Sequence, residues 1–191
     1  MRYQAEHKIA IHQKIVKDAA RRVRAEGMTG TAVGAVMRDA GLTHGGFYKH
    51  FRNKDELLTE SLSEAFGQIG DSLAQVARRA KPGMEWKAIV KAYLSLEHCD
   101  HAEWGCPVAA LGPELARANQ QSKERVLAEV MRYRNKLAPM MPGRRRADKE
   151  RAFFAIYSTM VGAVEIARML PSPAMREKVL KTARDFLLRS F

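Results

Sequence analysis

The stretch over residues 31–58, TAVGAVMRDAGLTHGGFYKHFRNKDELL, constrains the fold of this chain more than any other segment. Apolar side chains recur at helical spacing over residues 33–37, and Gly41 follows where a tight turn can form. Phe47 and Phe51 are four residues apart, so a second short helix brings both rings to one face, which must be buried. Two short helices around a glycine-containing turn, followed directly by a third helix, are typical of the helix-turn-helix arrangement, whose second helix enters a DNA major groove.

Polar and cationic side chains accompany the two phenylalanines, and folding alone does not require them there. Thr31 and Thr43 precede the first two helices and are predicted N-caps, because a hydroxyl can accept the free N–H groups of the next turn. The remaining groups provide hydrogen bonds or positive charge on the outer side of the second helix. They are Thr43, His44, Tyr48, Lys49 and His50.

The string at residues 41–51, GLTHGGFYKHF, with Lys54, Leu57 and Leu58 after it, resembles the DNA-binding domain of the tetracycline-repressor (TetR) family of bacterial regulators. The aromatic residues, the tyrosine, the histidine and the downstream lysine all fall at the family's spacing. The resemblance implies that Tyr48 and His50 contact phosphates and that four groups approach base edges, namely Thr43, His44, Gly45 and Lys49. Lys54 is poorly placed for the helix dipole in the first turn of its helix, and a DNA phosphate would relieve that mismatch. Thr31 can also donate to phosphate, through its hydroxyl or its amide.

The 191 residues carry a net charge of +12, and 46% of them are hydrophobic, enough to bury a substantial core. A strongly basic chain favours an anionic partner, and nucleic acid fits that charge. Residues 1–60 contain 11 Lys and Arg against 7 Asp and Glu, so they account for only +4 and the other +8 lies beyond the motif. Charge alone also fits a generally basic protein, and the motif therefore carries the prediction of DNA binding.

Helical signals dominate the rest of the chain, and strand signals are almost absent. The periodicity predicts an all-α fold of nine helices, with a loop at residues 98–106, Pro107 in the first turn of a helix, and Pro113 interrupting that helix or starting a new turn. Besides the two motif helices and the one at Pro107, the expected spans are 5–26, 53–79, 84–97, 121–138, 147–170 and 174–190. We expect an N-terminal helix-turn-helix DNA-binding domain over residues 1–53 and an effector-binding and dimerisation bundle over residues 54–191.

No window approaches the run of about 18 apolar residues that spans a bilayer, and the charged N-terminus has no apolar signal-peptide core. We therefore expect a cytoplasmic protein. Its two cysteines do not make a disulfide framework and are expected to be thiols in a reducing compartment. The sequence contains no nucleophile elbow, P-loop, dinucleotide fingerprint or HExxH motif, so we expect neither an enzyme nor a bound cofactor or metal.

Residues 98–107, HCDHAEWGCP, leave three alternatives open. Two histidines and two cysteines suit a zinc site, although their spacing is irregular. If Pro107 opens a helix, Cys106 occupies its N-cap, where the helix dipole lowers a thiol pKa, and Gly105-Cys106 resembles the equivalent place in a TetR branch that includes sensors of electrophiles and oxidants. A disulfide switch between Cys99 and Cys106 is a variant of this second alternative. The third is an unmodified cysteine with a structural or ligand-pocket role.

By resemblance, the second domain holds a pocket for a small effector, whose binding changes the separation of two DNA-binding domains and releases the DNA. Aromatic and sulfur-containing side chains are the candidates to line this pocket, and ordinary core packing is the alternative for them. The candidates are Trp86, Tyr93, Trp104, Met131, Phe154, Tyr157 and Met160, together with Cys99 and Cys106.

One helix-turn-helix unit reads only a few base pairs, and the family solves this by dimerising, so that two such units enter successive major grooves. The last two helices are the candidates for the interface, one through small residues and the other through apolar residues near the chain end. The alternative is that the first of them is the buried centre of the bundle. The residues are Ala155, Ser158, Thr159, Gly162, Ala163 and Ala167 on the first helix, and Leu187, Leu188 and Phe191 on the second.

These features predict a homodimeric TetR-like transcriptional regulator, most simply a repressor. We expect it to bind a palindromic double-stranded DNA operator and to be released by a small molecule or by cysteine modification. An architectural protein that binds DNA without sequence preference is the rival interpretation, because the basic charge is dispersed. No pattern in the sequence identifies the operator, the effector, the regulated genes or the sign of regulation.

Overall fold

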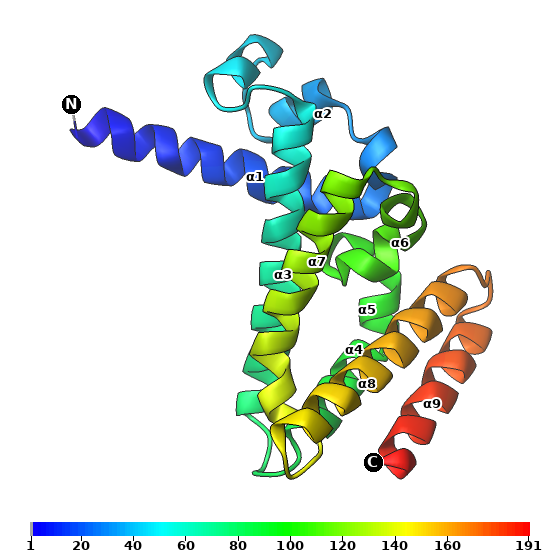
Figure 1. The fold of residues 1–191 in the computed structure, drawn as a ribbon. Coiled ribbons are helices and arrows are strands. Elements are labelled where there is room, and N and C mark those ends of the chain that lie inside the picture. The colour runs from blue at the N-terminus through cyan, green and yellow to red at the C-terminus, as the bar shows by residue number, and fades with distance from the viewer. Residues whose placement is uncertain (1) are drawn as a thin grey trace.

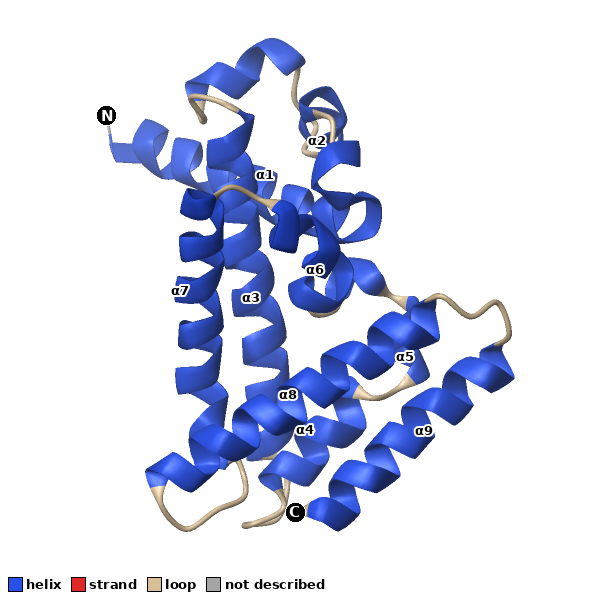
Figure 2. Ribbon diagram, turned by 45° about the vertical axis from the view of Figure 1, so that its right-hand side comes forward, coloured by secondary structure: helices blue, strands red, loops and turns tan. Residues whose placement is uncertain are grey.

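The computed structural model describes residues 2–191, which form helices and connecting segments without a strand (Figures 1 and 2). The prediction of an all-α fold is confirmed. The elements in chain order are α1 (Arg2–Gly30), α2 (Val33–Asp39), the 3-10 helix η1 (His44–Lys49), α3 (Lys54–Arg78), α4 (Glu85–Tyr93), α5 (Leu96–Asp100), η2 (Ala102–Trp104), α6 (Pro107–Arg117), α7 (Gln120–Leu137), η3 (Ala138–Met140), α8 (Arg146–Arg168) and α9 (Pro173–Ser190).

The described residues form two hydrophobic cores, and the long helices α1 and α3 contribute to both. The smaller core joins α1 to α2, η1 and the start of α3, where Leu57 is its last member. Further along α3, Leu62 belongs to the larger core, which α4 to α9 complete. We refer to the unit around the smaller core as the head and to the rest as the body. The buried residues of the head are Ile15, Val16, Ala19, Val36, Met37, Ala40, Phe47, Phe51 and Leu57.

Helix α3 is a continuous helix of 25 residues that runs from the head to the far end of the body, with α7 alongside it (Figures 1 and 2). It begins where the sequence predicts, because Asn53 Oδ1 accepts a hydrogen bond from the N–H of Glu56 at 2.9 Å. The Glu56 carboxylate accepts from the backbone N–H of Arg52 and not from that of Asn53, so the reciprocal half of the capping box is displaced by one residue.

The predicted threonine caps of the head are wrong. Ala32 is the N-cap of α2, while Thr31 is buried and donates its hydroxyl to the carbonyl of Gly27 at 2.7 Å. Thr43 occupies the N-cap position of η1, but its side chain makes no capping hydrogen bond. Helix α1 is interrupted at Gly27, whose φ of 79° lies in the left-handed region that favours glycine, so the predicted end of the first helix is confirmed. The last residues of α1 form a further helical turn beyond this kink.

The expected single helix over residues 84–97 is divided in two, and part of the expected loop after it is helical. Helix α4 ends at Tyr93, and Ser95 then caps the short helix α5 by accepting a hydrogen bond from the N–H of His98 at 3.2 Å. The backbone at Leu94, between the two helices, has a ψ of 56°, which no longer continues an α-helix. The predicted spans of the helices nearest the C-terminus are close to those of α7, α8 and α9.

Pro113 does not end or restart α6, which continues through it to Arg117. Proline lacks the N–H that would pair with the carbonyl of Ala109, four residues earlier. The guanidinium of Arg168, from α8, donates to that carbonyl at 3.1 Å and replaces the missing donor. Within the described part of the chain, no helix is both long and apolar enough to cross a membrane.

Candidate DNA-binding surface and regulatory core

Phe47 and Phe51 anchor η1 in the head. Each ring is only 2% exposed, and the two stack with their centroids 5.4 Å apart. The ring of His12, from α1, stacks on Phe51 at 4.6 Å, and its Nε2 is 2.7 Å from the carboxylate of Glu60 on α3. The predicted core role of the two phenylalanines is confirmed, and their burial fixes which side of η1 faces outward.

The outward side of η1 carries the side chains that the sequence singles out for DNA contact. Tyr48 is 72% exposed, although a tyrosine ring is large and partly apolar. The exposed groups of this surface are Thr43, His44, Gly45, Tyr48 and Lys49. Lys54 is half-buried in the first turn of α3, where the structure gives it no ion pair with a described residue.

Two predicted contact residues are less accessible. His50 is half-buried, its Nδ1 has no hydrogen-bond partner in the described structure, and burial, followed by the charges of His12, Lys8 and Lys49, lowers its pKa. Thr31 is 1% exposed, and its hydroxyl is used by the carbonyl of Gly27. The predicted phosphate contact through the Thr31 hydroxyl is therefore wrong, because that group stabilises the kinked end of α1.

In the body, Cys106 lies at the N-cap of α6, as the sequence predicts, and has no exposed surface. Its N–H donates to His98 Nε2 at 3.0 Å, so His98 carries its proton on Nδ1, which donates to the carbonyl of Tyr93 at 2.7 Å. Burial, opposed by the hydrogen bond to the Tyr93 carbonyl and aided by the charges of Arg168 and Arg24, lowers the pKa of His98 to about 4. A neutral imidazole thus joins the end of α4 to the start of α6.

The Cys106 thiol is surrounded by tyrosines. Its Sγ lies 3.4 Å from the hydroxyl of Tyr157, and the hydroxyls of Tyr93 and Tyr133 are buried without a hydrogen-bond partner in the described structure. Burial raises the pKa of all three phenols well above the usual value. The burial of Tyr133 was not predicted. Its helical spacing from Val126 and Val130, which pack against the same core, could have indicated it.

The other predicted sensor and metal residues do not converge on one point. Cys99 is 2% exposed, and burial raises the pKa of its thiol. Both cysteines are free thiols. Within the described residues, no group of three or more His, Cys, Asp or Glu side chains could hold a metal ion. A reagent can reach Cys106 only when the surrounding core opens, because a thiolate needs access as well as a low pKa to react.

The predicted effector residues fall into different environments. Trp86 is 4% exposed and packs edge-to-face on Phe191 at 6.3 Å. Trp104 and Phe154 are 53% and 40% exposed, and Arg21 lies over the Trp104 ring at 4.4 Å. Tyr157 and Met160 are buried in the larger core, and Met131 is half-buried. Their role in effector binding stays a prediction.

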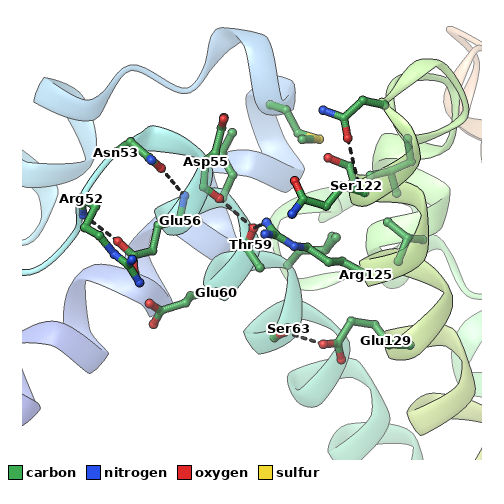
Figure 3. Close-up of a pocket in the computed structure, with 18 of the residues that line it drawn as sticks. Arg52, Asn53, Asp55, Glu56, Thr59, Glu60, Ser63, Ser122, Arg125 and Glu129 are labelled. Atoms are coloured by element: carbon green, nitrogen blue, oxygen red, sulfur yellow. Dashed lines mark hydrogen bonds and ion pairs between the residues drawn. The ribbon is translucent and has the colours of Figure 1, made fainter.

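Two hollows open on the described surface of the body. One of about 470 Å³ lies between α3, α4 and α5, and Tyr93, His98 and Trp104 line it. The other, of about 690 Å³, separates the start of α3 from α7 near the head (Figure 3). In it, Arg125 donates to the Thr59 hydroxyl at 2.7 Å. Sequence analysis missed this cleft because its walls come from segments far apart in the chain.

Helix α6 and the turn before it are attached to α1 of the head. The Glu114 carboxylate accepts hydrogen bonds from the N–H groups of Met28 at 3.0 Å and Thr29 at 3.3 Å. Arg24 is 3% exposed and donates to the carbonyl of Gly105 at 3.2 Å. Burial lowers the pKa of Arg24 to about 10, so the guanidinium stays charged at neutral pH. Neither contact was predicted, because each joins residues more than 80 positions apart.

The predicted interface residues of α8 and α9 separate into two sets. Ala163 is 7% exposed and Leu187 is 1% exposed, so both pack inside their own chain, and their interface role stays a prediction. Ala155 is exposed, and Thr159, Gly162 and Leu188 are half-buried. Sequence analysis missed the large apolar side chains that are exposed on the same two helices. These are Ile166 at 50%, Met169 at 73%, Met175 at 46% and Phe186 at 58%.

An all-α body joined to an exposed helix-turn-helix head defines the class of DNA-binding regulators. A family model described as "Bacterial regulatory proteins, tetR family" matches residues 15–60. Two Mycobacterium tuberculosis proteins, each named an uncharacterized HTH-type transcriptional regulator, are 27% identical over 187 residues, covering 92% of this chain and 93% of their own. Over residues 15–60 the chain therefore matches the TetR family, and along most of its length it is similar to HTH-type transcriptional regulators.

Several solved structures share the fold of this chain. A TetR transcriptional regulator from Chloroflexus aurantiacus aligns with a TM-score of 0.76 at 22% identity, over 95% of this chain and 94% of its own. The reduced form of Escherichia coli NemR aligns with a TM-score of 0.74 at 13% identity, over 93% and 95%. Bacillus subtilis FadR, solved in complex with stearoyl-CoA, aligns with a TM-score of 0.67 at 17% identity, over 94% and 98%.

Proposed function

We propose that this protein is a repressor that binds a palindromic operator as a homodimer and releases it when an effector binds the body or when a cysteine is modified. The observation that carries the proposal is the exposed ridge of Thr43, His44, Tyr48 and Lys49 on an η1 helix whose phenylalanines are buried. A fold does not need this concentration of exposed donors, whereas a major groove does. Such a regulator acts in the cytoplasm.

Tyr48 of this ridge and the half-buried His50 and Lys54 beside it are assigned to phosphates. The groups assigned to base edges are Thr43, His44, Gly45 and Lys49. Gly45 supports the close approach of DNA. A Cβ atom at Gly45 would meet nothing within 4 Å, and its φ is outside the left-handed region, so neither packing nor backbone geometry requires glycine there. Glycine in a helix costs about 1 kcal/mol relative to alanine, and a duplex lying against the backbone provides a reason to accept that cost.

The homodimer is supported by large apolar side chains that are exposed on the last two helices. Phe154 and Ile166 are exposed on α8, Met169 at its C-cap, and Phe186 on α9. Exposed apolar patches of this kind mark interaction sites in soluble proteins. A two-fold dimer through these helices carries two heads, which matches half-sites about 34–36 Å apart on DNA.

We consider two routes by which the protein releases DNA, and both act on the body. The pocket lined by Tyr93, His98 and Trp104 offers aromatic rings and a neutral imidazole to an uncharged or weakly polar ligand. The fold also holds an acyl-CoA in the B. subtilis FadR structure. Modification of Cys106 is the alternative route, and it requires the core to open first.

The test compares binding to the protein's own promoter DNA with binding to unrelated DNA of equal length, at physiological salt, before and after a mild oxidant or quinone. We expect a preference for the promoter on the order of a thousandfold. Loss of that preference on treatment, with Cys106→Ser resistant, assigns release to the thiol. Retained binding in the treated wild type assigns release to a non-covalent ligand. Equal binding to both DNAs would contradict the proposed function.

A further inference from the structure

The operator-binding head does not account for the charge of the chain. Residues 78–87 and 134–151 together contain 11 Lys and Arg against 3 Asp and Glu, a net charge of +8 out of +12. The first segment covers the end of α3 and the turn to α4, and the second covers the end of α7, the following loop and the start of α8. Figures 1 and 2 both place these segments together at the end of the body opposite the head.

This end is too far from the head to assist operator binding. Helix α3 separates Lys54 from Arg78, and its 25 residues span about 37 Å at the usual rise per residue. Exposed charges are screened beyond about 8–10 Å at physiological salt. The basic excess therefore adds nothing to the affinity of the head for its own duplex.

Two of the three carboxylates in these segments, Asp148 and Glu150, already pair with neighbouring arginines. Asp148 pairs with Arg145 at 2.9 Å, and Glu150 pairs with Arg146 at 3.0 Å. Lys136 pairs with Asp71 at 2.5 Å. Five exposed cations remain without an ion pair among the described residues, and we call them the distal surface. They are Arg78, Arg79, Lys81, Arg144 and Arg151.

We infer that the distal surface binds the phosphate backbone of a second DNA segment while the head holds the operator. Like charges gathered on one end destabilise the folded chain unless a counter-charge neutralises them. Four of the five residues are arginines, whose planar forks match phosphate oxygens. The five are exposed and are spread over the end of α3, the segment after it, the loop before α8 and the first turns of α8, so the surface suits an extended polyanion.

The class of partner follows from spacing as well as charge. A duplex presents one negative charge per about 1.7 Å of its axis and can neutralise several cations at once. The distal surface faces away from the DNA at the head, so the partner is a different duplex, or a remote stretch of the same molecule looped back. The inference goes beyond operator binding, because contacts to phosphates carry no sequence information.

The first test does not use the operator. We would measure binding of an unrelated labelled duplex to the full-length protein carrying Tyr48→Phe, Lys49→Ala and Lys54→Ala, over a range of salt. To this protein we would add three distal substitutions, Arg79→Gln, Lys81→Gln and Arg144→Gln. The slope of log K against log salt should then fall by about 0.9 for each phosphate that the protein no longer neutralises. The matched control adds Arg117→Gln, Lys123→Gln and Lys178→Gln, which are equally exposed and without ion pairs in the described structure. It should leave the slope unchanged.

If the distal and the control substitutions reduce the salt slope equally, the inference is overturned, because the reduction then reflects net charge alone. Binding to anionic lipid vesicles but not to the duplex would overturn it in favour of a membrane partner. Thermal unfolding of each variant checks that exposed glutamines leave the fold intact. If the wild type shows no sequence preference, the proposed function fails. The change in salt slope caused by the distal substitutions still tests this inference.

A second test uses the promoter fragment once it is shown to bind. With that fragment immobilised and saturated by protein, the wild type should recruit the unrelated labelled duplex. A distal variant that carries only Arg79→Gln, Lys81→Gln and Arg144→Gln should bind the fragment as well as the wild type and recruit at least tenfold less of the second duplex. Recruitment by the distal variant at the wild-type level would contradict the inference.

Discussion

Glu114 holds Thr29 through two hydrogen bonds: its carboxylate accepts from the backbone N–H at 3.3 Å and from the hydroxyl at 3.2 Å. The same oxygen accepts from the N–H of Met28 at 3.0 Å. These amides open the last turn of α1 after the kink at Gly27, where no residue of α1 can cap them. A carboxylate of α6 therefore serves as the cap of a helix in the head, and any displacement of α6 acts directly on the connection to α2.

The first prediction follows from that contact. Glu114→Gln keeps the side-chain size but replaces a charged acceptor by a neutral one, so the hydrogen bonds weaken. We expect the amides of Met28 and Thr29 to exchange with solvent several-fold faster, and the free energy of unfolding to fall by about 1–2 kcal/mol. Hydrogen exchange and urea unfolding are the measurements. Glu124→Gln, on the exposed face of α7, is the control, and equal exchange rates in the two variants would contradict the assignment.

Gly27 gives a second prediction. Its φ is +79°, and a Cβ atom there would lie 2.5 Å from Oε1 of Glu114. Gly27→Ala should therefore lower the free energy of unfolding by about 1–3 kcal/mol. Gly67→Ala, inside α3 with nothing within 4 Å of the new Cβ, should instead raise it by about 0.5–1 kcal/mol. Denaturant unfolding separates the two, and a neutral Gly27→Ala would show that the kink is not required.

A third prediction separates the roles of two neighbouring residues in the DNA-binding ridge. Tyr48→Phe removes a hydroxyl assigned to phosphate, so affinity should fall by a similar factor for every DNA sequence. Lys49→Ala removes a donor assigned to a base edge, so preference at one base pair should relax, at a cost of about 1–3 kcal/mol for the favoured base. Binding to a panel of single-base operator variants measures both. A uniform loss for Lys49→Ala would assign that lysine to the phosphates.

The fourth prediction concerns pH. Burial lowers the pKa of His98 from 6.5 to about 4. Between pH 6.5 and pH 4, His98 is therefore protonated in the unfolded chain but remains neutral in the folded chain. Stability contributed by neutral His98 is complete above about pH 6.5 and is lost as the pH falls toward 4, by an amount on the order of 3 kcal/mol. Urea unfolding at pH 7 and pH 4.5 measures it. His98→Gln should show a shallower pH dependence than the wild type, and an unchanged slope would rule out His98 as its source.

A fifth prediction tests the helix that continues through proline. Arg168 donates to the carbonyls of Cys99, Ala109 and His98, so Arg168→Ala should lower the free energy of unfolding by about 2–5 kcal/mol. Pro113→Ala restores an N–H to the carbonyl of Ala109. The double variant should therefore lose less than the sum of the two single changes, as a double-mutant cycle measures. Strict additivity would mean that Arg168 does not compensate for the proline.

Periodicity predicted the all-α fold, most helix spans and the burial of Phe47 and Phe51, because these depend on neighbours within one or two turns. It failed where the deciding partner is remote. Pro113 was expected to interrupt α6, and the donor that permits the helix to continue comes from Arg168, 59 positions after the carbonyl it serves. Ala163 and Leu187 show the same limit: their spacing indicates an apolar face, but not whether that face meets the same chain or a second copy.

The candidate DNA surface was more predictable than the body because a short local motif encodes it. Thr43, His44, Tyr48 and Lys49 are exposed as the motif implies, while Thr31 is buried by a contact across the kink at Gly27. The hollows of the body were not predictable, since each is lined by several helices whose approach depends on tertiary packing. No spacing in the sequence indicates which of these helices lie next to one another.

Leu57 and Leu62 belong to different cores but to the same uninterrupted helix. A cut at residue 53 removes Leu57, which is 1% exposed, from the head that it closes. The head is consequently not an autonomous module, and the two cores should melt in a single cooperative transition. Exchange of heads between relatives, whether by recombination or by design, preserves this arrangement only when the first two turns of α3 travel with the head.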